Sequence, residues 1–275
     1  MNQRLLCVVL MAAALLCAVG RATAVVLLGT FEPEIGDLNG LGFDPVSDLI
    51  YVHAEFDSDI HIYSRSGVLK GTVPDPGDRG NDSDIEFADE AININGTLVP
   101  ANSLLAIEND SSPPRLIAAN KSTGTVLATT VMDLRAIGQL TGGAFHHDRN
   151  TFFVIDWLSD SVHEVNPSTG VIVNTFDVNN IGPVSWDAFF SDLDVSRETG
   201  YLYLVSDSQN TIRVVTATGV WVEDIDVDPL GVSQMSGIGF DDVRGELWIS
   251  GESTPSLQKS WSLRQCPECV EAVQD

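Results

Sequence analysis

The sequence has few basic residues, and this excludes several classes of partner. It contains 14 Lys and Arg against 39 Asp and Glu in 275 residues, which gives a formal net charge of −25 at pH 7. Recognition of nucleic acid needs a basic face, and peripheral binding to anionic lipid needs basic clusters. We therefore expect no nucleic-acid partner. Because 44 % of the residues are hydrophobic, the chain is not a disordered acidic segment either.

Long hydrophobic runs are also missing, except at the start of the chain. Residues 5–19 are almost wholly apolar, and residues 22–24 (Ala-Thr-Ala) fit a small-x-small cleavage site. We interpret residues 1–24 as a secretory signal peptide. The alternative, a membrane anchor, is disfavoured because about fifteen apolar residues fall short of the roughly 20 that span a bilayer. The protein is thus expected to be secreted or extracytoplasmic (periplasmic or extracellular), without stable membrane association after cleavage.

Cysteine is scarce in the predicted mature chain. Cleavage removes two of the four cysteines, together with two Arg and no acid, so the mature charge becomes −27 and only Cys266 and Cys269 remain. A secreted context favours a local disulfide or free thiols at this pair. Half of a zinc site or a redox pair is the alternative, although zinc needs four ligands and a redox pair usually follows a strand of a βαβ unit. We place both cysteines in a C-terminal tail, residues 264–275.

The sequence lacks a sustained helical period but repeats a strand pattern. Each copy has a short strand that ends in an anchor residue, a polar turn, and further strands that alternate apolar and polar residues. The anchors are 44–58 residues apart. They are Phe43, Phe87, Phe145, Val195 and Phe240.

About four strands in every 40–50 residues, repeated about five times, are typical of an all-β fold, the β-propeller. We predict a propeller of four-stranded blades over residues 25–263. Five blades follow from the count, and a sixth would follow if residues 95–138 held an extra element. The last copy lacks a fourth strand, which the spare strand at residues 25–31 supplies, closing the ring. A pair of β-sandwiches or an open solenoid is the alternative.

The repeat unit resembles blades of known propellers. Residues 192–219, the phrase DLNGLGFDP at 37–45 and SGIGFD at 236–241 are similar to the SdiA-regulated type and, more loosely, to the NHL and SMP-30/gluconolactonase superfamily. The resemblance covers most of residues 25–263. It implies a fold rather than an activity. Gluconolactonase-like members hold calcium in the central channel and hydrolyse lactones or phosphoesters.

Four acids are expected to face the central channel. Side chains alternate along a strand, so residues one and three places before each anchor share a face. Three blades place Gly or Ala there, and two blades place two acids each. Four carboxylates in one channel repel each other unless a cation or water relieves them. We predict a Ca²⁺ site, against the alternative of solvated acids in a wide, wet channel. The proposed ligands are Asp84, Glu86, Asp192 and Asp194.

Other chemistry has little support in the sequence. No Gly-x-Ser-x-Gly elbow, phosphate-binding loop or dinucleotide fingerprint is present. His61, His163 and Arg213 occupy one repeat position, which indicates an exposed strand face. We expect a binding or scaffold propeller, with an unknown small molecule, glycan or protein as its partner. The alternative is a metal-dependent hydrolase of lactones or phosphoesters that uses the channel carboxylates.

Overall fold

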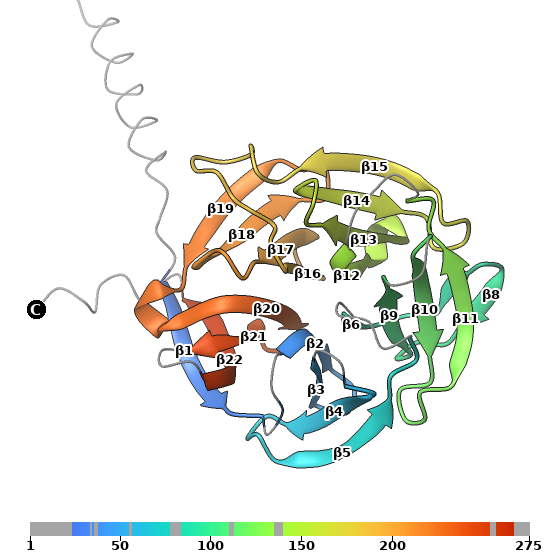
Figure 1. Ribbon diagram of the computed structural model, residues 1–275, viewed down its shortest axis with the longest axis horizontal. Coiled ribbons are helices and arrows are strands. Elements are labelled where there is room, and N and C mark those ends of the chain that lie inside the picture. Colours follow the sequence, from blue (N-terminus) through green and yellow to red (C-terminus); the bar gives the residue numbers. More distant parts are fainter. Residues whose placement is uncertain are drawn as a thin grey trace, which may run out of the picture.

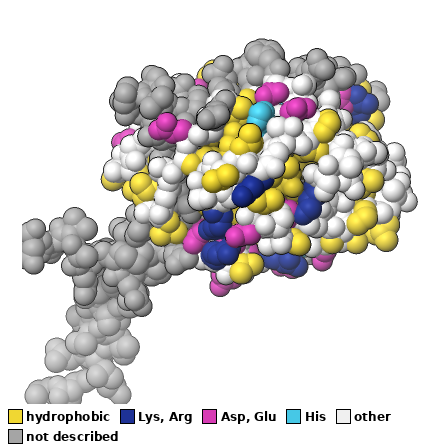
Figure 2. All heavy atoms as spheres, turned by 90° about the horizontal axis from the view of Figure 1, so that it is seen from below, with side chains coloured by type: hydrophobic (Ala, Val, Ile, Leu, Met, Phe, Trp, Pro, Cys, Tyr) yellow, Lys and Arg dark blue, Asp and Glu magenta, His cyan; other side chains and the backbone are white. Residues whose placement is uncertain are grey.

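The computed structural model describes residues 24–33, 35, 38–54, 57–77, 84–109, 113–134, 140–253 and 257–266. The predicted signal peptide, apart from its last residue, and Cys269 lie outside these ranges. Among the helices within them, none is long and apolar enough to cross a membrane. On the side shown in Figure 2, acidic side chains lie among basic and hydrophobic ones rather than in one continuous patch.

The described strands form five four-stranded antiparallel sheets around a central axis (Figure 1). The prediction of a β-propeller built from four-stranded blades is confirmed. The first sheet contains β2 (Leu38–Asp44), β3 (Leu49–Ala54), β4 (Asp59–Ser64) and β5 (Leu69–Pro74). The second contains β6 (Ile85–Phe87), β9 (Leu104–Glu108), β10 (Arg115–Ala119) and β11 (Val126–Val131).

The next two sheets follow the same order along the chain. The third contains β12 (Leu140–His146), β13 (Thr151–Asp156), β14 (Ser161–Val165) and β15 (Ile172–Asp177). The fourth contains β16 (Asp192–Val195), β17 (Tyr201–Val205), β18 (Thr211–Thr216) and β19 (Trp221–Asp226). In Figure 1 the first strand of each sheet lies nearest the axis, so these strands line the channel.

The last sheet closes the ring with the N-terminal strand, as predicted. It contains β20 (Val232–Asp241), β21 (Glu246–Ser253), β22 (Leu257–Cys266) and β1 (Ala24–Phe31). β1 pairs antiparallel with β22 from Ala24 opposite Cys266 to Phe31 opposite Ser260. β22 therefore ends three residues later than the boundary predicted at 263. Pairing the two ends of the domain removes an exposed sheet edge on each.

Within the described part of residues 95–138, where an extra element would have added a sixth blade, the strands outside the second sheet belong only to a hairpin. A two-stranded hairpin, β7 (Ile92–Ile94) with β8 (Thr97–Val99), is inserted between the first and second strands of the second sheet. Two 3₁₀ turns complete the elements, η1 (His147–Arg149) and η2 (Asp228–Leu230). The long second repeat thus contains one ordinary blade and a hairpin.

The core lies between neighbouring sheets. The anchors Phe43, Phe87, Phe145 and Val195 are between 2 % and 6 % exposed and belong to four different apolar clusters. Small residues let the inner strands approach closely. A Cβ atom on Gly42, for example, would lie 2.5 Å from the carbonyl oxygen of the neighbouring strand's Ile85. Because successive side chains of a strand point to opposite faces of its sheet, apolar residues at every second position pack against the next blade.

The prediction of an exposed face at His61, His163 and Arg213 is wrong for the last two, and the His61 side chain is only 17 % exposed. His163 is 3 % exposed and Arg213 is fully buried. The segment 178–191 covers this side of the fourth blade, and its Val178 and Val184 carbonyls accept hydrogen bonds from Arg213 at 2.8 and 2.9 Å. Asp224 pairs with the same guanidinium through two hydrogen bonds. The alternation of side chains along a strand does not show whether a segment distant in the sequence covers one of its faces.

Candidate functional site

The structure brings the four predicted channel acids together as two pairs. Asp84 directly precedes β6 and Glu86 lies on it, whereas Asp192 and Asp194 lie on β16, two blades away. The inner strand between them, β12, places Gly142 and Ala144 at the corresponding positions. A Cβ atom on Gly142 would lie 2.5 Å from the Cα atom of Asp192, so glycine is needed for this approach. Asp84 hydrogen-bonds to Asp192, and Glu86 to Asp194.

These carboxyl groups also bind the backbone of neighbouring inner strands. The Oδ2 atom of Asp84 accepts a hydrogen bond from the Gly143 amide on β12 at 2.7 Å. Asp192 and Asp194 accept hydrogen bonds from two amides of β20, those of Ile238 and Phe240, at 2.8 and 2.6 Å. The acids on β6 and β16 therefore fix two of the interfaces around the ring.

Burial raises the pKa of all four groups. The pKa of Asp84 rises to about 8, first through burial and then through the charge of Asp194. Burial raises the pKa of Asp194 to about 7. It holds the pKa values of Glu86 and Asp192 well above their usual range, assisted by the charges of Asp194 and Asp84, respectively. The raised pKa values favour a shared proton within each pair near neutral pH. Burial contradicts the alternative of solvated acids for Asp84, Asp192 and Asp194, whereas Glu86 is half-buried.

The oxygen atoms of the pairs are largely engaged by backbone donors. Both carboxyl oxygens of Asp84, Asp192 and Asp194 accept amide hydrogen bonds, and so does Oε1 of Glu86. Among the described residues, no group of three or more His, Cys, Asp or Glu side chains has the geometry of a metal site. The calcium site stays a prediction, in which an ion would replace the shared protons.

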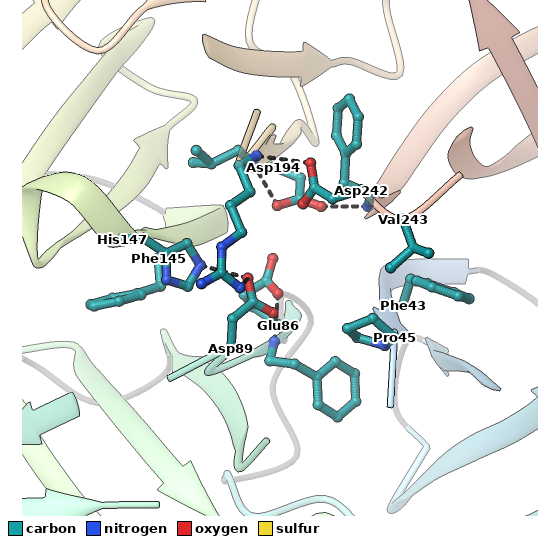
Figure 3. A pocket seen from close by; sticks show the side chains of 13 residues that line it. Phe43, Pro45, Glu86, Asp89, Phe145, His147, Asp194, Asp242 and Val243 are labelled. Atoms are coloured by element: carbon teal, nitrogen blue, oxygen red, sulfur yellow. Dashed lines mark hydrogen bonds and ion pairs between the residues drawn. The ribbon is translucent and has the colours of Figure 1, made fainter. Parts of the chain in front are cut away.

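Glu86 and Asp194 also line a cavity of about 200 Å³ where the inner strands end. A cavity of this size admits several water molecules or one small molecule. In Figure 3 Glu86 lies beside Asp89 and Asp194 lies beside Asp242, whereas the rings of Phe43 and Phe145 point away from this space. The Phe43 and Phe145 rings pack behind the cavity wall, and the carboxyl groups face the interior of the cavity.

The rim of the cavity comes from the turns after the inner strands. His147 Nε2 lies 2.5 Å from Asp89 Oδ2, and an Arg197 guanidinium nitrogen lies 3.8 Å from the same oxygen. Asp242 accepts a hydrogen bond from the Arg197 amide at 2.9 Å. Burial raises the pKa of Asp242 to about 6, so this group is mostly ionised at neutral pH.

The rim residues were missed in the sequence, although the repeat contains the signal. Each rim residue lies two places after an anchor. The argument from alternating side chains covered only the strand residues before the anchors, so it did not include these turns. The same offset in all five blades gives one ring around the cavity mouth. The ring consists of Pro45, Asp89, His147, Arg197 and Asp242.

The arrangement favours positive charge. The Glu86–Asp194 pair with its proton keeps one negative charge, and Asp89 and Asp242 add two more. Arg197 supplies one positive charge, and His147 is engaged by Asp89. A cation about 4 Å from one uncompensated carboxylate gains about 4 kcal/mol at an effective dielectric constant near 20.

Comparisons with known proteins show the propeller fold. No family model and no curated protein matches the chain. The solved structures include glutaminyl cyclase of Myxococcus xanthus, with a TM-score of 0.62 and 13 % identity over 87 % of this chain and 95 % of that one. An aldose sugar dehydrogenase from Streptomyces coelicolor, in its PQQ-bound form, has a TM-score of 0.51 and 9 % identity over 89 % and 99 %. A luciferin-regenerating enzyme has a TM-score of 0.50 and 12 % identity over 88 % and 95 %.

Together, the ring of sheets and the acidic cavity define a β-propeller with a small-molecule-sized site at one end of its channel. The three similar structures share this fold with the chain, at identities of 9–13 %. The predicted resemblance to the SMP-30 and NHL propellers stays a prediction.

Proposed function

We propose that the protein binds a small organic cation, such as a primary amine, in the cavity at the end of the channel. The observation that carries this proposal is the convergence of Glu86, Asp89, Asp194 and Asp242 on one cavity of about 200 Å³. The volume excludes a macromolecular segment, and the excess of negative charge disfavours anions. We also propose that the protein acts outside the cytoplasm, in line with its predicted signal peptide.

Calorimetric titration with butylamine, butan-1-ol and butyrate tests the proposal, because the three probes differ mainly in charge. The amine is expected to bind more than tenfold tighter than the alcohol, since each charge–carboxylate contact contributes about 4 kcal/mol before desolvation. Asp242→Asn should weaken the amine selectively. Asp187→Asn, an exposed acid outside the cavity, is the matched control. Equal binding of the three probes, or an Asp242→Asn protein that binds like wild type, would refute cation selection.

A second candidate function is general acid–base catalysis at the same site. It is supported by the Glu86–Asp194 pair, because a carboxyl group with a pKa of about 7 can both donate and accept a proton at neutral pH. One of the similar structures is a glutaminyl cyclase. A glutaminyl peptide therefore belongs in the substrate panel. Turnover that is lost in Glu86→Gln would support this role, and turnover unchanged by Glu86→Gln would exclude it.

The calcium site and the metal-dependent hydrolase remain a separate proposal. It is supported by the four channel carboxyl groups, which would have to release their shared protons to bind a divalent cation. Titration of metal-stripped protein with Ca²⁺ at several pH values tests it, with Asp192→Asn as the comparison. Hydrolysis of lactones and phosphotriesters is assayed with and without the ion. No heat of binding and no change in melting temperature would exclude the site.

A further inference from the structure

The opposite end of the channel carries polar side chains on β-bulges. Register shifts leave Asn39, Thr141 and Ser236 as the extra residues of β2, β12 and β20. Ser191 directly precedes β16. Each of these residues lies four places before an anchor, so they stand about 13 Å along the strand from the acidic cavity at 3.3 Å for each residue. A bulge re-aims a side chain, and the same bulge in three blades points to a specific use of these positions.

These residues surround a second, much smaller cavity together with Phe190. Its volume is about 10 Å³, which is room for a single water molecule or hydroxyl group. The lining side chains are an amide, hydroxyls and one aromatic ring, without a formal charge. Thr141 Oγ1 and Ser191 Oγ lie 3.2 Å apart within it. The Ser236 hydroxyl donates to the Leu38 carbonyl, so it can still accept from a ligand.

An aromatic surface adjoins this cavity. Phe190 is 36 % exposed, stacks on Trp157 with ring centroids 5.9 Å apart and planes at 17°, and contacts Phe189 edge-on at 4.5 Å. The backbone of Phe190 has a φ of 42°, in the left-handed region that bulky residues avoid. Such strain persists only where the surroundings impose it and is concentrated at ligand-binding positions.

The segment before β16 is held in place by the fourth and third blades. Arg213 donates to the carbonyls of Val178 and Val184, and Asp160 accepts the Ala188 amide at 2.9 Å. The Phe189 carbonyl accepts hydrogen bonds from the Ser206 hydroxyl and the Asp207 amide, both at 3.0 Å. Phe190 is therefore presented on a fixed support beside the small cavity.

We propose that this mouth of the channel binds a neutral saccharide. The apolar C–H face of one sugar ring packs on Phe190, and one of its hydroxyls enters the 10 Å³ cavity among Asn39, Thr141 and Ser191. The absence of charge among the lining side chains disfavours an ion, and their polarity disfavours a wholly apolar ligand. The site is independent of the acidic cavity and of the function proposed there.

Titration with methyl glycosides of glucose, galactose and mannose, and with their disaccharides, tests this inference. Binding is followed by calorimetry and by tryptophan fluorescence, to which Trp157, stacked on Phe190, contributes as one of five tryptophans. Phe190→Asn removes the ring while keeping a residue that tolerates the left-handed region. Val184→Asn, on the same segment and outside the cavity, is the control. Thr141→Val removes one hydroxyl at nearly constant volume.

We expect at least one glycoside to bind with a Kd of about 1 mM, a weak affinity suited to a shallow site. Phe190→Asn should weaken it at least tenfold, and Thr141→Val about three- to tenfold, as for loss of one hydrogen bond. Val184→Asn and Asp242→Asn should bind like wild type, the latter separating this site from the acidic cavity. If Phe190→Asn fails to fold, Thr141→Val decides. Absence of binding by every glycoside, or Thr141→Val binding unchanged, overturns the inference.

Discussion

Replacing Asp192 by Asn is expected to change the pH dependence of stability in a defined way. The Asp192 carboxyl group is fully buried, accepts the Leu193 and Ile238 amides at 2.6 and 2.8 Å, and faces Asp84. Asparagine has the same size and keeps an oxygen acceptor for the Ile238 amide. Its NH₂ group can donate to the Asp84 carboxylate, but it replaces the oxygen that accepts the Leu193 amide. The variant therefore holds this contact without a shared proton.

The magnitude follows from the raised pKa values of the pairs. In the unfolded chain these groups lose their protons near the ordinary value of 3.8 for Asp, whereas burial raises the pKa of Asp84 to about 8 and that of Asp194 to about 7. Between about pH 5 and pH 7 the native state binds more protons than the unfolded state, so the free energy of unfolding falls as pH rises. One proton for each pair gives a slope of about −1.4 kcal/mol per pH unit, or about −2.7 for both.

Other groups act in different ranges or cancel in the comparison. Carboxylates with a lowered pKa contribute stability that is lost only on acidification below about pH 4.5. Burial lowers the pKa of His146, which opposes the slope below about pH 6.5 equally in both proteins. The carboxylates whose pKa is lowered in the folded protein are Asp57, Asp156, Glu164 and Asp177.

The assay is urea unfolding of wild type, Asp192→Asn and the exposed-acid control Asp187→Asn at a series of pH values. Wild type and the control should lose stability as pH rises, and the Asp192→Asn slope should be shallower by about 1.4 kcal/mol per pH unit. A wild-type slope of zero or positive sign above about pH 6.5, or an unchanged slope in Asp192→Asn, would refute the reasoning.

Three further predictions concern packing and ion pairs. Gly142→Ala should lower the free energy of unfolding by about 1–3 kcal/mol, because the added Cβ atom would lie 2.5 Å from the Asp192 Cα atom. Gly29→Ala should be nearly neutral, because nothing lies within 4 Å of the added atom. Equal effects of the two substitutions would contradict the close approach at Gly142. Arg213→Met should cost about 3–5 kcal/mol, because the partly buried Asp224 and the carbonyls of Val178 and Val184 lose their donor. A loss below about 1 kcal/mol in urea unfolding would contradict this. Arg65 connects the first sheet to the closing sheet through ion pairs with Asp241 and Glu246, whereas Arg115 pairs with Glu108 of its own sheet. Arg65→Gln should therefore lower the melting temperature more than Arg115→Gln. The reverse order in calorimetry would disprove a role of Arg65 in closing the ring.

The sequence was sufficient to predict the propeller fold and the direction in which the side chains of the four channel acids point. Alternation along the strands placed Asp84, Glu86, Asp192 and Asp194 on the inner face, because a two-residue period is a local property of a strand. Their pairing across β12 depends on Gly142 and Ala144 being small on a third blade, which is a property of the assembled ring. Local pattern does not reveal which inward acids are desolvated.

Residues outside the strands were harder to predict. Arg213 alternates as an exposed residue would, and only the return of segment 178–191 over the fourth blade buries it. The rim residues Asp89, His147 and Asp242 lie in turns, where acids and polar residues are common without any function. Their shared offset from the anchors becomes informative once the blades are arranged around one axis.

The chemistry proposed for the acidic cavity depends most directly on the proton held by Glu86 and Asp194. A ¹³C NMR titration of the side-chain carboxyl groups, assigned with Glu86→Gln and Asp194→Asn, measures it without any ligand. The pair is expected to release its shared proton only at about pH 7, far above the ordinary range of isolated carboxyl groups. Complete ionisation of both groups below about pH 5 would contradict the account.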